Sequence, residues 1–174
     1  NPIQMTVVTI FFTRGILIMS LNVNLNKNST MTSTVVYDEN LRTVCTHLRS
    51  GTVIETDAPP DNQGKGERFS PSDLVATALA SCMLTIMGIK ARDMKVDLKG
   101  IKVEVEKIMA SNPRRIGGLN LTFHFPAGFR ATDKEQTILE KAAMSCPVFY
   151  SIHPDIQTNV SFKWKKDAAV PERE

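Results

Sequence analysis

The chain has 174 residues, of which 42% are hydrophobic and 22% charged, with a formal net charge of +3. This length allows one domain with a hydrophobic core, and this composition excludes a disordered chain. A net charge so small, with few aromatic residues, does not favour nucleic-acid binding, and we interpret the basic run at residues 163–166 as a solvated strand end.

The chain contains three cysteines, Cys45, Cys82 and Cys146, which lie far apart in the sequence. Because no CxxC pair is present, neither a zinc site nor a thioredoxin-like motif is predicted. An odd number of cysteines at this low density also argues against a disulfide framework. We therefore expect a reducing, cytoplasmic location.

The first thirty residues differ from the rest of the chain. Arg14 interrupts their apolar stretches, which are too short for a membrane span and lack the basic start and small-residue cleavage site of a signal peptide. We expect residues 1–30 to be a non-core N-terminal extension, residues 31–166 to be the domain, and residues 167–174 to be a C-terminal tail. No membrane association is predicted.

Three β-strands are predicted before the first long helix. Residues 32–37 and 41–48 flank a turn-rich triplet, and residues 52–56 form the third strand. Residues 57–68 hold two prolines and two glycines among polar groups, so they are predicted to be a loop. Because this loop leads directly into the helix that carries Cys82, it is a candidate wall of a site.

The helix that follows has a well-formed start. Ser70 can cap it, Pro71 fits the first helical position, and Asp73 completes a capping box. Apolar residues at helical spacing predict a broad apolar face with Cys82 at its centre. Small residues along the same helix would let another helix approach closely.

The second half of the chain alternates strands with helices. Strands are predicted at residues 101–105 and 119–125 in a hairpin, then a helix that opens at residues 132–135, and a last strand at residues 156–164. Pro147 is expected to break the second helix and to start a short new turn. The order βββ-α-ββ-α-β, with strands in hairpins and segregated helices, indicates the α+β class.

Two of the cysteines are candidates for thiol chemistry. Cys82 lies about three turns inside its helix, too far for the macrodipole to lower its pKa much, so activation would need a nearby cation or hydrogen-bond donor. Taken alone, Cys82 is better explained as a small core residue. Cys45 is interpreted as packing, and the separated histidines His47, His124 and His153 give no metal-ligand spacing.

Cys146 precedes Pro147, so it can cap a helix whose unpaired backbone N–H groups would stabilise its thiolate. The alternative is that this segment is only a helix break. Reasoning from the residues alone, Cys146 is expected to be the more acidic thiol. Two cysteines that work as a pair would need Cα atoms within about 7 Å of each other.

Two segments of the chain resemble the OsmC/Ohr family of thiol-dependent hydroperoxide reductases. They are residues 69–82, with the sequence FSPSDLVATALASC, and residues 145–148, with the sequence SCPV. The resemblance is specific because two motifs occur together: the spacing from Pro71 to Cys82 in the first segment, and the Cys-Pro-Val sequence in the second. The resemblance extends from about residue 32 to residue 164 and leaves out the N-terminal extension.

The resemblance implies an OsmC-like α+β fold, with antiparallel sheets wrapped around two long central helices in an intertwined homodimer. It implies that Cys82 attacks an organic hydroperoxide and becomes a sulfenic acid, which Cys146 resolves as a disulfide. A dithiol reductant would regenerate the enzyme, and no metal, flavin or haem is called for. On this point the resemblance reverses the choice of reactive thiol made from the residues alone.

The chain also departs from the family pattern. The family's glutamate after the helix-starting proline is Ser72 here, and no arginine matches the family's N-terminal one. Arg49, Glu67 and Arg68 are possible substitutes, with ordinary loop charges as the alternative. We therefore interpret the chain as a divergent OsmC-like branch, for which a non-enzymatic, ligand-binding or redox-sensing dimer is the alternative function.

Overall fold

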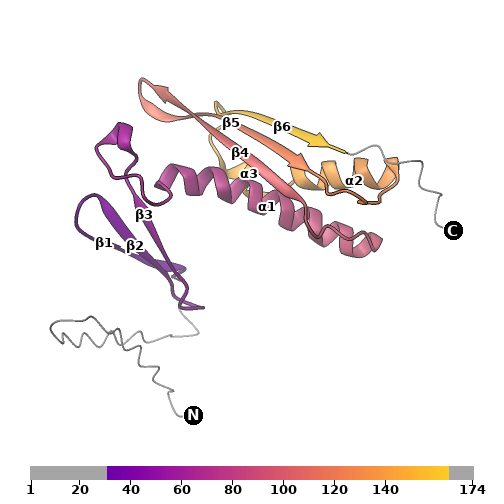
Figure 1. The fold of residues 1–174 in the computed structure, drawn as a ribbon, viewed down its shortest axis with the longest axis horizontal. Helices are drawn as coiled ribbons and strands as arrows, with labels where there is room; N and C mark the ends of the chain where they lie inside the picture. Colours follow the sequence, from indigo (N-terminus) through magenta and orange to yellow (C-terminus); the bar gives the residue numbers. More distant parts are fainter. Residues whose placement is uncertain (1–30, 165–174) are drawn as a thin grey trace, which may run out of the picture. The chain divides into compact units, whose positions relative to one another are not determined.

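A computed structural model describes residues 31–164 of the chain. These residues form two compact units, which divide between Phe69 and Ser70 and are called unit 1 and unit 2 below. Figure 1 shows their elements in the order β1-β2-β3, α1, β4-β5, α2-α3 and β6. The predicted N-terminal extension and C-terminal tail lie outside the described residues.

Unit 1 contains one antiparallel sheet of three strands in the order β1-β2-β3. The strands are β1 (Ser33–Tyr37), β2 (Arg42–His47) and β3 (Val53–Asp57), which confirms the three predicted strands to within two residues at each end. The predicted loop follows β3 and contains one short 3₁₀ turn, η1 (Pro60–Asn62).

Unit 2 begins with the long helix α1 (Pro71–Met94). The expected capping box is present: the Ser70 hydroxyl accepts a hydrogen bond from the Asp73 N–H, and the Asp73 carboxylate accepts one from the Ser70 N–H. Two backbone donors that a helix start leaves unpaired are thereby satisfied. The helix ends at Lys95, which has a left-handed conformation with φ of 58°.

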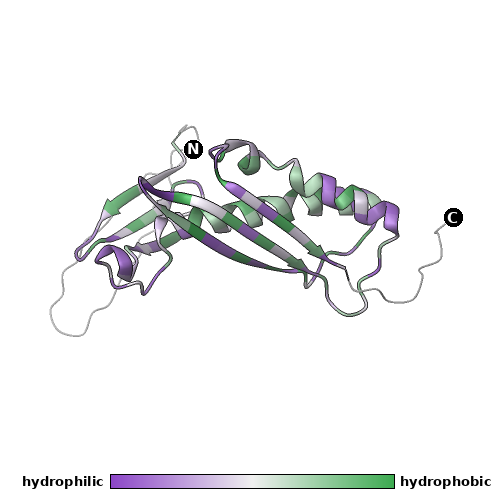
Figure 2. Ribbon diagram, turned by 90° about the horizontal axis from the view of Figure 1, so that it is seen from above, coloured by the Kyte–Doolittle hydropathy of each residue, from purple (hydrophilic) through white to green (hydrophobic). Residues whose placement is uncertain are grey.

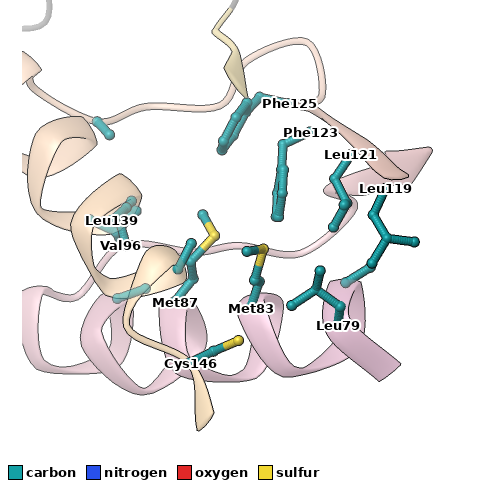
Figure 3. Packing of buried hydrophobic residues seen from close by; sticks show 14 of the residues in the cluster. Leu79, Met83, Met87, Val96, Leu119, Leu121, Phe123, Phe125, Leu139 and Cys146 are labelled. Atoms are coloured by element: carbon teal, nitrogen blue, oxygen red, sulfur yellow. The ribbon is translucent and has the colours of Figure 1, made fainter. Parts of the chain in front are cut away.

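The buried face of α1 is not centred on Cys82, so this expectation is wrong. The buried residues of the helix are Ala76, Leu79, Ala80, Met83, Met87 and Ala91. The large side chains of Leu79, Met83 and Met87 share one stripe at helical spacing and face the sheet (Figure 3). Cys82 lies at the rim of that stripe, partly exposed.

The sheet of unit 2 has the order β4-β5-β6. The strands β4 (Lys102–Ser111) and β5 (Arg114–His124) form the predicted hairpin and are longer than expected. The strand β6 (Gln157–Lys163) pairs with β5 in parallel, which corrects the expectation of a purely antiparallel sheet.

A helical crossover explains the parallel pair. Between β5 and β6 the chain forms α2 (Asp133–Met144) and α3 (Pro147–Ser151), and such a connection returns the chain to the end of the sheet from which β5 started. The helix α2 starts where the sequence predicts, and Thr132 and Glu135 form a capping box there. Because α1 spans 24 residues and α2 only 12, two long central helices stay a prediction.

The core of unit 2 lies between α1 and the sheet. Strands in both sheets alternate hydrophobic with hydrophilic residues (Figure 2). On β5, Leu119, Leu121 and Phe123 face Leu79 and Met83 of α1 (Figure 3). This packing fixes α1 on the sheet and so positions the cysteine that α1 carries.

Candidate functional site

The candidate site is built from two cysteines of unit 2. Cys82 comes from the middle of α1, and Cys146 comes from the junction of α2 and α3. Both thiols are free, and Cys82 packs against the hydrophobic cluster to which Cys146 belongs. The structure therefore brings together two residues that lie 64 positions apart in the sequence, since 146 − 82 = 64.

Local sequence explains where Cys146 sits. Helix α2 ends at Ser145, and Pro147 occupies the first position of α3, so Cys146 is left as the cap between them. Its Sγ accepts a hydrogen bond from the Phe149 N–H at 3.3 Å. The predicted cap is thus confirmed, and the interpretation as a mere helix break is not needed.

The electrostatic consequence of the cap is opposite to the expected one. Burial raises the pKa of the Cys146 thiol, the backbone N–H groups of Phe149 and Val148 oppose that change, and the adjacent Cys82 side chain raises the pKa further. Cys146 is 0% exposed, so desolvation of the thiolate outweighs the two backbone donors. The cap donors therefore do not lower the pKa of the Cys146 thiol below its ordinary value, contrary to the reasoning from the residues alone.

The two sulfur atoms also differ in access. Cys82 is partly exposed, whereas the side chain of Cys146 lies in the core beside α1 (Figure 3). Only Cys82 can meet a solute without a local opening of the structure. An exposed thiol next to a buried one can form a disulfide after the exposed sulfur has been oxidised.

The possible auxiliary residues all belong to unit 1. Glu67 accepts a hydrogen bond from Arg42 at 2.8 Å, and Arg68 pairs with Glu55 at 2.8 Å. Arg49 is exposed in the turn between β2 and β3. Each of Glu67 and Arg68 has an ion-pair partner within its own unit, and a role for the three in thiol activation stays a prediction.

Arg42 was not singled out in the sequence, although it anchors the charged network of unit 1. Its guanidinium binds Asp57 through two hydrogen bonds, at 2.6 and 2.8 Å, in addition to Glu67. The bond to Arg42 lowers the pKa of Asp57, which is 2% exposed. A hairpin register would have revealed this pair, because Arg42 and Asp57 lie directly opposite each other on β2 and β3.

A second charged network lies at the start of α1. Lys107 of β4 contacts the Ser72 hydroxyl at 2.7 Å, the Asp73 carboxylate at 2.7 Å and the Ser70 hydroxyl at 3.3 Å. Ser72 is the position at which the sequence departs from the family pattern, and its hydroxyl accepts a hydrogen bond from the Lys107 ammonium group. No local sequence signal predicts this contact, since the lysine belongs to a strand that follows the helix.

The remaining candidates carry no further chemistry. Cys45 lies within β2. His47 is exposed and bound to Ser50, and His124 is partly exposed and bound to Glu104. Residues 31–164 contain no cluster of three or more potential metal ligands. Within the same residues, every buried side-chain nitrogen or oxygen atom has a hydrogen-bond partner.

Comparisons with known proteins agree on one family. The family model for OsmC-like proteins matches residues 64–161, which include both cysteines of the site. A search of curated proteins finds no match.

Solved structures give the same result. A candidate osmotic stress induced and detoxification response protein from Psychrobacter arcticus 273-4 is 52% identical, with a TM-score of 0.74, and the match covers 78% of this chain and 97% of that one. The organic hydroperoxide resistance protein OsmC from Legionella pneumophila is 16% identical, with a TM-score of 0.61. That match covers 78% of this chain and 99% of the Legionella chain. At that identity the second likeness concerns the fold alone.

Proposed function

The chain belongs to the OsmC-like protein family, and from this premise we propose that it reduces organic hydroperoxides through Cys82 and Cys146. The observation that carries the proposal is the meeting of a partly exposed thiol with a buried one inside the same cluster. This arrangement supports one sulfur that reacts with the oxidant and a second that captures the product.

In the first step the Cys82 thiolate attacks the outer oxygen of a hydroperoxide. The O–O bond breaks, the alkoxide takes up a proton and leaves as an alcohol, and the Cys82 sulfur is oxidised to a sulfenic acid. Access supports this assignment, because Cys146 is fully buried while Cys82 is not.

In the second step the Cys146 sulfur attacks the Cys82 sulfenic sulfur. A disulfide forms, and the departing hydroxide combines with the Cys146 proton as water. Since the raised pKa keeps Cys146 protonated at neutral pH, this thiol brings its own proton to the leaving group. A neutral, buried thiol is also protected from direct oxidation, which depends on thiolate character and exposure.

The surroundings of the two sulfurs favour organic peroxides over hydrogen peroxide. Ile86, one turn after Cys82 on α1, and Val148 and Phe149 of α3 are partly buried apolar side chains that pack against the same cluster. Apolar side chains next to the reacting sulfur can contact the carbon tail of an organic hydroperoxide, and hydrogen peroxide has no such tail.

We further propose that the working form is a homodimer. The α1 helix is long and apolar enough to cross a membrane by length and composition alone, yet only 33% of its most apolar window is buried within the chain. In unit 1, Val35 and Ile54 are 61% and 47% exposed on one face of the sheet. A second copy of the chain that covers these surfaces would bury an apolar area that a monomer leaves in water.

A dithiol in a reducing, cytoplasmic compartment is the proposed reductant. Its two thiols can reduce the Cys82–Cys146 disulfide in two consecutive exchanges and leave as a cyclic disulfide. No nucleic acid or membrane takes part in the proposed cycle.

The alternative function is a non-enzymatic dimer that binds a small ligand or senses oxidants. One observation favours it: the hydroxyl of Ser72, at the departure from the family pattern, is bound by Lys107. Without the usual acidic residue at this position, thiol activation has a different basis or is weak.

The experiment compares two oxidants on the fully reduced protein in a Cys45→Ser background. We expect cumene hydroperoxide to form the Cys82–Cys146 disulfide faster than hydrogen peroxide does, as followed by mass spectrometry. Cys82→Ser should abolish turnover, whereas Cys146→Ser should permit one oxidation event and then stop. Thiol loss no faster than that of a free small thiol would reject the enzyme in favour of the binding dimer.

A further inference from the structure

The two thiols of the candidate site form a pair of neighbouring sulfur ligands. The Cys82 side chain hydrogen-bonds to the Cys146 thiol, and both residues belong to unit 2. Helix α1 fixes one sulfur, and the junction of α2 with α3 fixes the other. Two donors that are held next to each other bind one atom more tightly than two separate donors do, because little freedom is lost on binding.

The ligand set limits which atom the pair can hold. Structural zinc takes four ligands, and calcium and magnesium take oxygen ligands. Among residues 31–164 no third potential ligand joins the two cysteines, since no group of three or more His, Cys, Asp or Glu residues is found there. An acceptor that suits the pair must therefore be thiophilic and must need only two bonds from the protein.

We propose that the reduced Cys82–Cys146 pair binds a trivalent arsenical that carries one organic group, R–As(OH)2. The two sulfurs replace the two hydroxyl groups, and the arsenic keeps its bond to carbon. This ligand class goes beyond the proposed peroxidase activity and does not depend on it, because no peroxide takes part. One chain supplies both sulfurs, so each copy in the proposed homodimer would hold one arsenical.

The reaction balances without an oxidant or a reductant. Two As–O bonds break and two As–S bonds form, while arsenic stays trivalent and each sulfur stays at the oxidation state of a thiol. The proton of each thiol leaves with one hydroxyl group as water. Since the raised pKa keeps Cys146 protonated at neutral pH, this thiol brings the proton that its hydroxyl group needs. After the first As–S bond has formed, the second forms within one molecule and benefits from a high effective concentration.

The surroundings favour an organic group at the third position of the arsenic. Ile86 of α1 and Val148 and Phe149 of α3 are partly buried apolar side chains that pack against the cluster containing Cys146. Within residues 31–164 every buried side-chain nitrogen or oxygen atom already has a hydrogen-bond partner. A hydroxyl group that loses water without gaining a partner is unfavourable, whereas a methyl or phenyl group gains from apolar contacts. Inorganic arsenite keeps one hydroxyl group after two thiols have bound, so it should bind more weakly.

The test measures the binding of phenylarsine oxide to the reduced protein after the reducing agent has been removed. Native mass spectrometry in excess glutathione should find one phenylarsenic group per chain, with the loss of two hydrogen atoms. Cys82→Ser and Cys146→Ser should each weaken binding by about a hundredfold or more, because one sulfur cannot chelate. Cys45→Ser is the matched control, since it removes the free thiol of unit 1 and should leave binding unchanged. Equal loss in the three variants, or unchanged binding in Cys82→Ser or Cys146→Ser, would overturn the inference.

Oxidation supplies a control that needs no substitution in the pair. Diamide joins Cys82 to Cys146 in the Cys45→Ser protein without any peroxide, and the oxidised protein should lose the binding of phenylarsine oxide and regain it after reduction. Binding that persists after oxidation would overturn the inference. Arsenite should bind the reduced protein about tenfold or more weakly than phenylarsine oxide does. Equal binding of the two would overturn the assignment of the organic group.

Arsenical binding and peroxide reduction can be told apart in the same preparation. A protein that forms the disulfide with cumene hydroperoxide, but holds phenylarsine oxide no better than Cys82→Ser does, would retain the proposed function and reject the arsenical site. A protein that binds phenylarsine oxide tightly, but reacts with cumene hydroperoxide no faster than a free small thiol, would reject the proposed function and retain the arsenical site.

Discussion

Unit 1 and unit 2 differ in what they bury. All the buried hydrophobic residues among residues 31–164 belong to unit 2, where α1, β5 and α2 supply most of them. In unit 1 the two buried side chains are polar: Thr56, which shares a hydrogen bond with Thr43, and Asp57, which Arg42 holds. Unit 2 therefore has the core of an independently packed structure, while unit 1 has a sheet organised around an ion pair.

The difference explains why the candidate site belongs to unit 2. A sulfur can be held against another only where the surrounding side chains are packed closely enough to fix both. Unit 1 lacks such packing and leaves apolar strand residues in water, which is unfavourable unless another surface covers them. The two thiols of the candidate site therefore belong to unit 2, whereas the exposed apolar surface that a second copy would cover belongs chiefly to unit 1.

The largest expected effect is on the core of unit 2. Leu139 is 0% exposed, so Leu139→Ala removes buried methyl groups and leaves a cavity, and the free energy of unfolding should fall by about 2–5 kcal/mol. Urea unfolding measures this change. Tyr150→Ala is the control in the same unit, since this side chain is 74% exposed and its loss should change stability by about 0.5 kcal/mol or less. Equal effects of the two variants would contradict the assignment of the core.

The next effect concerns the exposed sheet of unit 1. Val35, Cys45 and Ile54 lie side by side across the three strands and so share one face. Val35→Asp places a charge in this row, and the proposed dimer should dissociate at a concentration about tenfold higher or more, as measured by light scattering during gel filtration.

Thr34→Asp is the matched control for the dimer, because the neighbouring residue points to the other face of the sheet. If both substitutions shift the dissociation equally, the row is not the contact. A parent protein that is monomeric at all concentrations would reject the homodimer and remove the explanation offered for the exposed row.

The fold was largely predictable from sequence because most of its signals are local. Alternation identified the strands, and Ser70 with Asp73 and Thr132 with Glu135 marked both helix starts within four residues. The parallel pairing of β5 with β6 was not predictable in this way. It depends on where the crossover returns the chain, and no short segment encodes that return.

The proximity of the two cysteines was predictable, but the direction of the Cys146 pKa shift was not. The resemblance selected Cys82 and Cys146, and the cap at Cys146 followed from Pro147. The sign of the Cys146 pKa shift did not follow, since burial depends on residues of α1 and β5 that are distant in sequence. Lys107 was missed for the same reason, because it lies 34 positions after Asp73 in the sequence (107 − 73 = 34).

A smaller effect is expected at Lys107, which connects β4 to the start of α1. Lys107→Met removes the contacts with Ser72 and Asp73 and should lower the stability of the protein by about 1 kcal/mol at neutral pH. Burial raises the pKa of Asp73, but the bonds from Lys107 and Ser70 outweigh it and hold the pKa below its ordinary value.

The pH dependence of this effect has a definite sign. A carboxylate whose pKa is lowered by folding contributes stability above its unfolded pKa and loses it as the pH falls through its folded pKa. The difference between the parent protein and Lys107→Met should therefore shrink in acid, and unfolding in urea at a series of pH values measures it. A difference that is unchanged in acid would assign the effect of Lys107 to packing alone.

The smallest effect isolates the influence of one thiol on the other. In the Cys45→Ser, Cys82→Ala protein, Cys146 is the one remaining cysteine, and the ultraviolet absorbance of its thiolate can be followed against pH. Removal of the Cys82 side chain eliminates one cause of the raised pKa, so Cys146 should titrate at a lower pH in this variant than in the Cys45→Ser protein that retains Cys82. The pKa of Cys146 in the Cys45→Ser protein is measured by alkylation at a series of pH values, mapped by mass spectrometry.

Because burial is the largest cause of the raised pKa of Cys146 and stays in place, the pKa should still exceed the ordinary cysteine value. A pKa at or below that value would show that the cap donors prevail over burial, and the reasons for assigning attack to Cys82 and resolution to Cys146 would then rest on access alone.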